Sequence, residues 1–181
     1  MTEAFAARAH VFIDESKSKN YYIAAAATGP ATAPDLDRAI RQLTRPGQRR
    51  IHFKTERDSS RKTILAKLSA LELSVHVYVA EGLPDKTARP LLLEALVADL
   101  AASKATRLMI ERDESLVEAD RRTIRSALVT NNYVYDLVYE HRAPTDYAML
   151  WVSDAVAWCY QAGGDWVRRA EPLVTGITRL G

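Results

Sequence analysis

The side chains best suited to chemistry are carboxylates at the ends of two apolar segments and within a third. Asp14 closes an apolar segment near the N-terminus, and Glu111 and Asp113 follow a second one. Asp154 is the only charged residue in the stretch 147–161. An unpaired carboxylate in apolar surroundings is costly. Each acid must therefore be protonated, paired with a cation or bound to a metal.

Carboxylates that share a site repel one another unless cations lie between them. Hard oxygen ligands favour Mg²⁺ or Mn²⁺ over zinc, and a single cysteine excludes a cysteine metal cluster. If the strands are neighbours, Asp14, Glu111 or Asp113, and Asp154 converge. Two ions about 4 Å apart could then stabilise the attacking and leaving oxygens of a phosphodiester displacement. The alternative for Asp154 is a salt bridge to an arginine or a loop cap.

Basic residues concentrate between positions 38 and 67, a stretch that contains ten Lys and Arg residues and only two acidic residues. This stretch is a candidate phosphate-binding surface, and we expect Lys54, Arg57 and Arg61 to contact a nucleic-acid backbone. The alternative is a solvated face of two helices and a loop. His52, in the same stretch, either contacts phosphate or positions a water, or is simply a partly exposed residue.

The elements that position these residues follow from hydrophobic periodicity and turn signals. A mixed sheet that opens with an antiparallel hairpin and is flanked by helices is expected, because strands come first as a hairpin and then alternate with helices. The predicted strands are 10–13, 21–27, 50–53, 74–80, 107–110 and 133–140. The predicted helices are 35–44, one beginning at 58 or 59, 85–103, 118–130, 147–161 and a shorter one within 166–180.

Length and composition place the chain among ordinary globular proteins. The 181 residues predict a single domain, 1–181. No run of eighteen apolar residues could span a bilayer, and the N-terminus lacks the pattern of a secretory signal. We therefore expect a cytoplasmic location. The net charge of +2 says little, because it averages an uneven distribution.

Four short motifs occur in order along nearly the whole chain: VFIDESKS, RIHFKTE, LMIERDES and LWVSDAVAW. Together they resemble the DUF3800 family of prokaryotic proteins, which opens with a strand ending in Asp-Glu-Ser and closes with a helix containing an acid. The resemblance implies a ribonuclease H-like fold with a five-stranded mixed sheet. It also implies a metal-dependent nuclease site built from acids.

By position, the resemblance assigns Asp14 as the first-strand acid, Glu111 or Asp113 as the second and Asp154 as the helix acid, with Glu56 as a possible fourth. Two departures are Ser153, where the family often has Ala, and Glu111, where Asp is expected. The resulting hypothesis is an Mg²⁺- or Mn²⁺-dependent nuclease in which Asp14 bridges the ions. The alternatives are an inactive module that binds nucleic acid or a protein partner, and a small-molecule phosphohydrolase.

Overall fold

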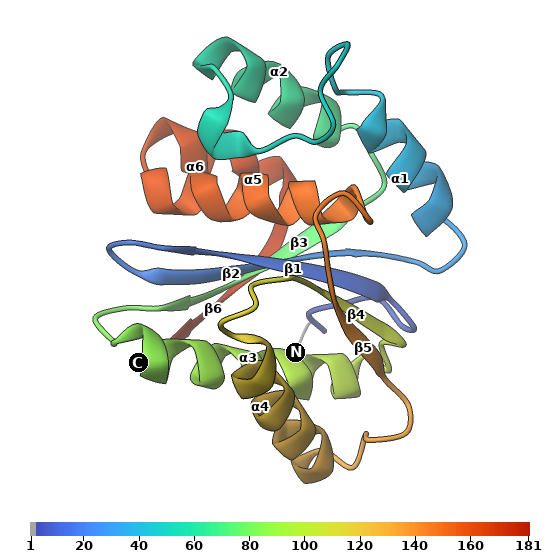
Figure 1. Ribbon diagram of the computed structural model, residues 1–181, viewed down its shortest axis with the longest axis vertical. Helices are drawn as coiled ribbons and strands as arrows, with labels where there is room; N and C mark the ends of the chain where they lie inside the picture. The colour runs from blue at the N-terminus through green and yellow to red at the C-terminus, as the bar shows by residue number, and fades with distance from the viewer. Residues whose placement is uncertain (1–2) are drawn as a thin grey trace.

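The computed structural model describes residues 3–181 and contains one six-stranded mixed sheet with helices on both faces (Figure 1). The strands are β1 (His10–Lys17), β2 (Tyr21–Thr28), β3 (Ser74–Ala80), β4 (Arg107–Glu111), β5 (Val138–Arg142) and β6 (Val174–Leu180). The α-helices are α1 (Ala33–Arg41), α2 (Asp58–Leu68), α3 (Asp85–Ala102), α4 (Val117–Thr130), α5 (Met149–Ala162) and α6 (Asp165–Ala170). Two 3₁₀ turns are η1 (Phe53–Thr55) and η2 (Glu171–Leu173).

The strand order is β5-β4-β1-β2-β3-β6. The strands β1, β2 and β3 form an antiparallel meander, whereas β4 is parallel to β1, β5 is parallel to β4, and β6 is parallel to β3. In the β1–β4 pair His10 lies opposite Arg107, and Phe12 lies opposite Met109. Asp14 and Glu111 are thus brought together at the far end of the same pair.

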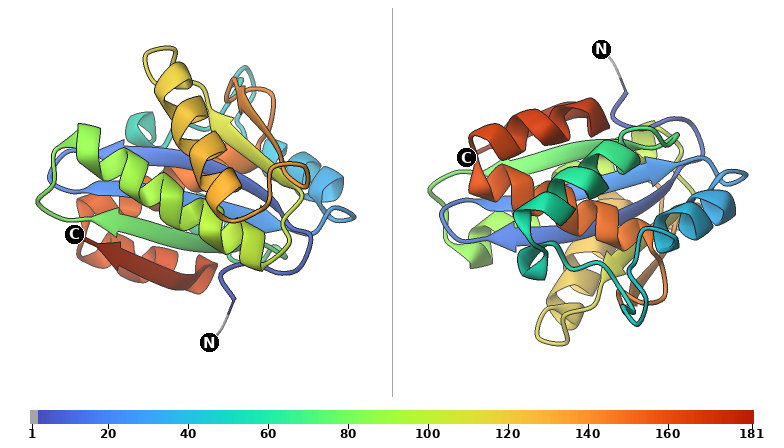
Figure 2. Two further views of the ribbon diagram at one scale, coloured as in Figure 1. Left: turned by 90° about the horizontal axis from the view of Figure 1, so that it is seen from below. Right: turned by 90° about the horizontal axis from the view of Figure 1, so that it is seen from above.

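The alternation of side chains along the strands divides the core into two layers. Phe12 and Met109 pack with α5 on one face, whereas Val11, Ile13 and Leu108 pack with α3 and α4 on the other. Figure 2 shows α3 and α4 crossing one face of the sheet (left) and α5 on the other face, with α2 lying over it and α1 and α6 beside it (right). This central position explains why α5 is apolar nearly all round.

The predicted fold class is confirmed, as are the opening hairpin and the strand at 74–80. The strand predicted at 50–53 is wrong, because this segment is a loop leading into η1. Ile51 and Phe53 alternate with polar residues because they anchor the loop on the core around α5, not because it joins the sheet. The last predicted strand begins late, at Val138.

The C-terminal region also differs from the prediction of a helix within 166–180. The helix α6 ends at Ala170, and residues 174–180 form the edge strand β6. Gly176 lies opposite His76, and a Cβ at this position would stand 2.7 Å from the imidazole ring. The glycine therefore permits a close strand approach and does not mark a helix end. Along residues 3–181, no helix is both long and apolar enough to cross a bilayer.

Candidate active site

Asp14 is the central residue of the acid group. It lies on β1, two residues after Phe12, so its side chain faces α5. The backbone N–H of Glu15 donates a hydrogen bond to Asp14 Oδ1 (2.8 Å). Burial raises the pKa of Asp14 well above its ordinary value, and the negative charges of Glu111 and Asp154 raise it further. Glu111 and Asp154 are thus close enough to oppose the ionisation of Asp14.

Glu111, the last residue of β4, has an incompletely satisfied carboxylate. Its Oε1 is 3.7 Å from Arg50 Nη1, whereas its buried Oε2 has no hydrogen-bond partner among residues 3–181. Burial raises the pKa of Glu111. A hydrogen bond from Asp14 and the charge of Arg50 act in the opposite direction, but the pKa stays above its ordinary value. Arg50 Nε is likewise buried without a partner. Buried polar atoms without partners are uncommon and mark a place suited to a ligand.

Asp154 projects from α5 and fixes the loop before α2. Its Oδ2 accepts a hydrogen bond from the backbone N–H of Phe53 (2.8 Å) and lies 3.5 Å from His52 Nδ1. The hydrogen bond to Asp154 raises the pKa of the half-exposed His52, although burial opposes this effect. The segment 50–53 therefore brings a cation and an imidazole beside the acids.

The described part of the chain contains no group of three or more His, Cys, Asp or Glu side chains already arranged to hold a metal ion. The contacts above explain why, since Glu111 is turned towards Arg50 and Asp154 is turned towards Phe53 and His52. The three acids share a neighbourhood without forming a finished coordination shell.

Two other predicted acids lie outside this group. Asp113 accepts hydrogen bonds from the backbone N–H (3.0 Å) and hydroxyl (2.6 Å) of Ser115, and these lower its pKa. Glu111, and not Asp113, is the acid whose charge acts on Asp14. Glu56 is buried and accepts hydrogen bonds from Arg45 and Gln48, so it stabilises its own loop.

The predicted nucleic-acid contacts divide into two kinds. Lys54 and Arg57 are exposed and free to meet solvent or a ligand. Arg61 instead donates to the carbonyl oxygens of Phe53 (2.9 Å) and Lys54 (3.0 Å), and its guanidinium stacks 4.0 Å from the centroid of the Trp158 ring. It therefore serves the fold by tying the loop to α2 and α5.

Sequence reasoning missed Arg50 as a site residue and placed His52 only among alternatives. Their signal is the alternation in Arg-Ile-His-Phe, which turns Ile51 and Phe53 inward and leaves the other two side chains for the acids. The same alternation led to the incorrect strand prediction. The contact between the Phe53 backbone and the distant Asp154 is what distinguishes a loop beside the acids from a strand of the sheet.

A second polar cluster lies on the opposite face of the sheet and was not foreseen. Arg89 on α3 donates two hydrogen bonds to Asp120 on α4 (2.7 and 2.8 Å) and one to the Tyr21 hydroxyl (2.9 Å). Glu15 Oε2 lies 3.1 Å from the same guanidinium, and His141 Nε2 lies 2.9 Å from Asp120 Oδ2. We call these five residues the Arg89 cluster.

No protein-family model and no curated protein matches the chain. Among solved structures it is similar to the one described as the PCNA:RNase HII complex from Archaeoglobus fulgidus, with a TM-score of 0.55. The two are 14% identical, and the match covers 91% of this chain and 75% of that chain. The fold is ribonuclease H-like. The fold that the motifs implied is thereby confirmed, with six strands where the family resemblance implied five.

Proposed function

We propose that the chain is a divalent-metal-dependent nuclease that hydrolyses phosphodiester bonds of nucleic acid. The main support is the convergence of Asp14, Glu111 and Asp154, in which burial and neighbouring negative charge raise the pKa values of Asp14 and Glu111. Holding like charges together costs folding free energy. A site of this kind suits a cation, and the ribonuclease H-like fold supports a nuclease among the activities that use one.

The donor set fits Mg²⁺ or Mn²⁺, since all three side chains offer hard oxygens and Glu111 Oε2 lacks a partner within the described residues 3–181. When bound, such an ion polarises phosphoryl oxygens and makes water a stronger nucleophile. Asp14, Glu111 and Asp154 would hold the ion. Because the 50–53 segment already contacts Glu111 and Asp154, ion binding competes with those contacts.

The chain's own cations would orient the substrate. Arg50 stands beside Glu111 with an unused Nε–H, so it can donate to a phosphate oxygen close to the acids. His52 is half-exposed next to Asp154 and can donate to the same phosphodiester. The exposed Lys54 and Arg57 follow directly along the chain and would contact the nucleic-acid backbone.

The test is cleavage of RNA, DNA and an RNA–DNA hybrid by the full chain with Mn²⁺. Asp14→Asn should reduce the rate at least about a thousandfold, or about 4 kcal/mol of transition-state stabilisation, without unfolding the protein. Asp113→Asn, a nearby acid outside the group, serves as the matched control and should keep its activity. Undiminished activity in Asp14→Asn would contradict the proposal.

A second candidate is an inactive binding module on the same fold, whose partner is nucleic acid or a protein. It is favoured by the lack, among residues 3–181, of a group of three side chains arranged for a metal. Calorimetric titration with Mn²⁺ separates the two candidates. The module should show no site tighter than about 1 mM, whereas the nuclease should show one that Asp14→Asn removes.

We also propose membership of the DUF3800 family on the four motifs given above. A profile built from family members and aligned with this chain would test it. Membership requires Asp14, Glu111 and Asp154 to align with the family's acids in that order, and an alignment that misses two of them would contradict it.

A further inference from the structure

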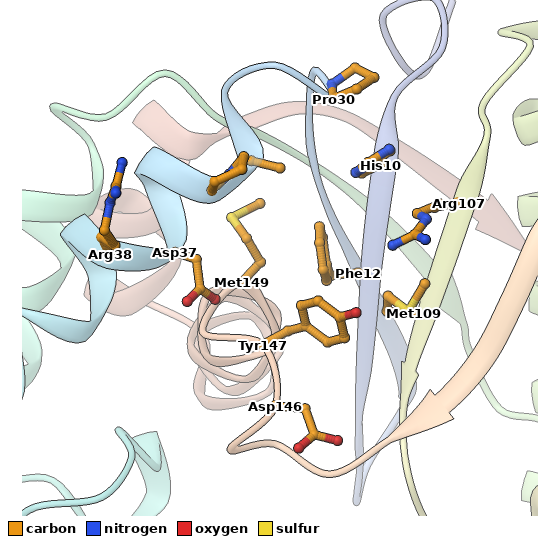
Figure 3. Close-up of a pocket in the computed structure, with 12 residues that line it drawn as sticks. His10, Phe12, Pro30, Asp37, Arg38, Arg107, Met109, Asp146, Tyr147 and Met149 are labelled. Carbon is orange, nitrogen blue, oxygen red and sulfur yellow. The ribbon is translucent and has the colours of Figure 1, made fainter.

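A separate pocket lies at the opposite end of the β1–β4 pair from the acids. It has a volume of about 400 Å³ and is enclosed by the beginnings of both strands, by α1 and by the segment before α5 (Figure 3). His10 and Arg107 stand at one end of the pair, whereas Asp14 and Glu111 stand four residues further along. At the rise of an extended strand this separation is about 13 Å, so the pocket is distinct from the acid group.

The inner part of the pocket is apolar and suited to a flat molecule. Phe12 and Tyr147 meet with their ring centroids 5.6 Å apart, and Figure 3 shows both rings at the cavity between the strands and α1. The thioethers of Met109 and Met149 and the ring of Pro30 complete this surface. Aromatic and thioether groups pack well against planar rings, and the volume is within the range of small-molecule sites.

One guanidinium that lines the pocket, that of Arg107, is not paired with a carboxylate among residues 3–181. Arg107 has no carboxylate within salt-bridge distance in the described chain, and it lowers the pKa of the adjacent His10, as burial does even more strongly. The acids cannot serve it, because Asp37 uses one oxygen for Arg41 (2.6 Å) and the other for the backbone N–H of Ala148 (2.7 Å).

The remaining charged residues are also engaged. Arg38 is paired with Asp35, and Asp146 Oδ2 lies 3.9 Å from Arg142 Nε. Arg107 is therefore the cation that an entering ligand would meet. Arg107 is exposed, so an anionic group can reach it, whereas a neutral molecule gains nothing from its charge and a cation is repelled by it.

We propose that this pocket binds a small organic anion with a flat apolar body of about two fused rings. The rings lie against Phe12, Tyr147 and Met109, and the anionic group pairs with Arg107. The class includes aromatic carboxylates and nucleoside monophosphates, which share a planar body and one anionic end. The inference does not depend on the nuclease proposal.

The test is calorimetric titration of the full chain with 2-naphthoate, with its neutral analogue 2-naphthamide and with adenosine 5′-monophosphate. We expect one saturable site for 2-naphthoate and at least about tenfold weaker binding of the amide, since hydrogen bonds to charged groups contribute about 1.5–3 kcal/mol. Tighter binding of the nucleotide than of 2-naphthoate would assign the site to nucleotides within the same class.

Two variants and one control variant check the location. Arg107→Gln should weaken 2-naphthoate binding at least about tenfold, whereas Arg125→Gln, an exposed arginine on α4, should leave it unchanged. Ala33→Trp, at the partly exposed start of α1, should fill the cavity and abolish binding. Thermal melts confirm that each variant folds. Equal affinity in Arg107→Gln, or no binding of either anion tighter than about 1 mM, would overturn the proposal.

Discussion

Asp14 and Glu15 are consecutive acids on one strand, and they face opposite sides of the sheet. Glu15 meets Arg89, which is also bound to Asp120 and Tyr21. Asp14 meets two more carboxylates, and the nearby Arg50 lies 3.7 Å from Glu111 and 3.3 Å from His52 Nδ1. Each carboxylate of the Arg89 cluster therefore lies against the Arg89 guanidinium, whereas in the acid group only Glu111 has a guanidinium within salt-bridge distance among residues 3–181. The first arrangement stabilises the fold, and the second is suited to binding something from outside.

The titration of the two groups reflects this contrast. Burial disfavours ionisation of Asp120, but hydrogen bonds from Arg89 and His141 outweigh it and lower the pKa of Asp120. Burial alone would lower the pKa of Arg89. Its contacts with Asp120 and Glu15 outweigh this effect, so the pKa is raised. In the acid group burial and neighbouring charges act in the same direction on Asp14. Identical side chains thus differ because of their partners and not because of burial alone.

The largest effect is expected from removing the cation of the Arg89 cluster. Arg89→Met would leave Glu15 without its cation and the buried Asp120 with His141 as its remaining side-chain partner among residues 3–181. Breaking a buried pair in this way typically costs about 3–5 kcal/mol. Urea unfolding should show this loss, and Arg125→Met on the exposed face of α4 should change stability by no more than about 0.5 kcal/mol. A loss equally small in both variants would show that the cluster does not stabilise the fold.

The neighbouring acids should respond with opposite signs when neutralised. Glu15→Gln removes a partner of Arg89 and should lower the free energy of unfolding by about 2 kcal/mol. Asp14→Asn removes one of three repelling charges and should raise it by about 1 kcal/mol in metal-free buffer at neutral pH. Chemical denaturation with a chelator present measures both changes. The same sign in both variants would contradict the contrast between the two faces.

Metal-free stability should depend on pH in two separate ranges. The folded-state pKa values of Asp14 and Glu111 are raised, so the folded chain holds more protons and loses about 1–2 kcal/mol as pH rises from about 4 towards neutrality. Asp120 has a lowered pKa, so its contribution is present above about 4 and is lost below it.

Denaturation curves collected across both ranges, for the natural chain and for Asp14→Asn, measure this dependence. The variant should flatten the decline towards neutral pH and retain the loss in acid. An unchanged slope above pH 4 in the variant would show that the acid group is not its source.

The smallest effect is expected for Arg50→Gln. Its guanidinium is a quarter exposed and 3.7 Å from Glu111, so the pair contributes no more than about 1 kcal/mol to stability. Removing the Arg50 guanidinium should nevertheless raise the pKa of Glu111 further, because its positive charge lowers that pKa in the natural chain. Carboxyl ¹³C shifts followed through a pH titration measure the change, and a lowered Glu111 pKa would contradict the assigned contact.

The part of this contrast that local sequence could predict is the acid group. Asp14 follows the apolar part of β1, Glu111 ends β4, and Asp154 interrupts an apolar helix, so their positions follow from short-range patterns. Their convergence needed only the β1–β4 pairing, which the alternation of strands and helices suggested. The fold class was predictable for the same reason.

The remaining features depend on contacts between distant segments. Arg89 and Glu15 are 74 positions apart, and no local pattern distinguishes a buried arginine from the exposed ones on other helices. The loop that carries Arg50 and His52 resembles a strand until Asp154 binds its backbone. Gly176 resembles a helix breaker until His76 is seen beside it. In each case the deciding partner lies about 70 positions or more along the chain.

One side chain of α5 sets how near this helix lies to the sheet. Ser153, which immediately precedes Asp154, is fully buried. Its hydroxyl donates a hydrogen bond to the carbonyl oxygen of Phe12 (2.6 Å). A larger residue at 153 would lift the helix and carry Asp154 away from the strands, whereas alanine would keep the spacing but lose the anchor. A single hydroxyl thus ties α5 to β1 directly beside the helix carboxylate, two residues before the strand carboxylate Asp14.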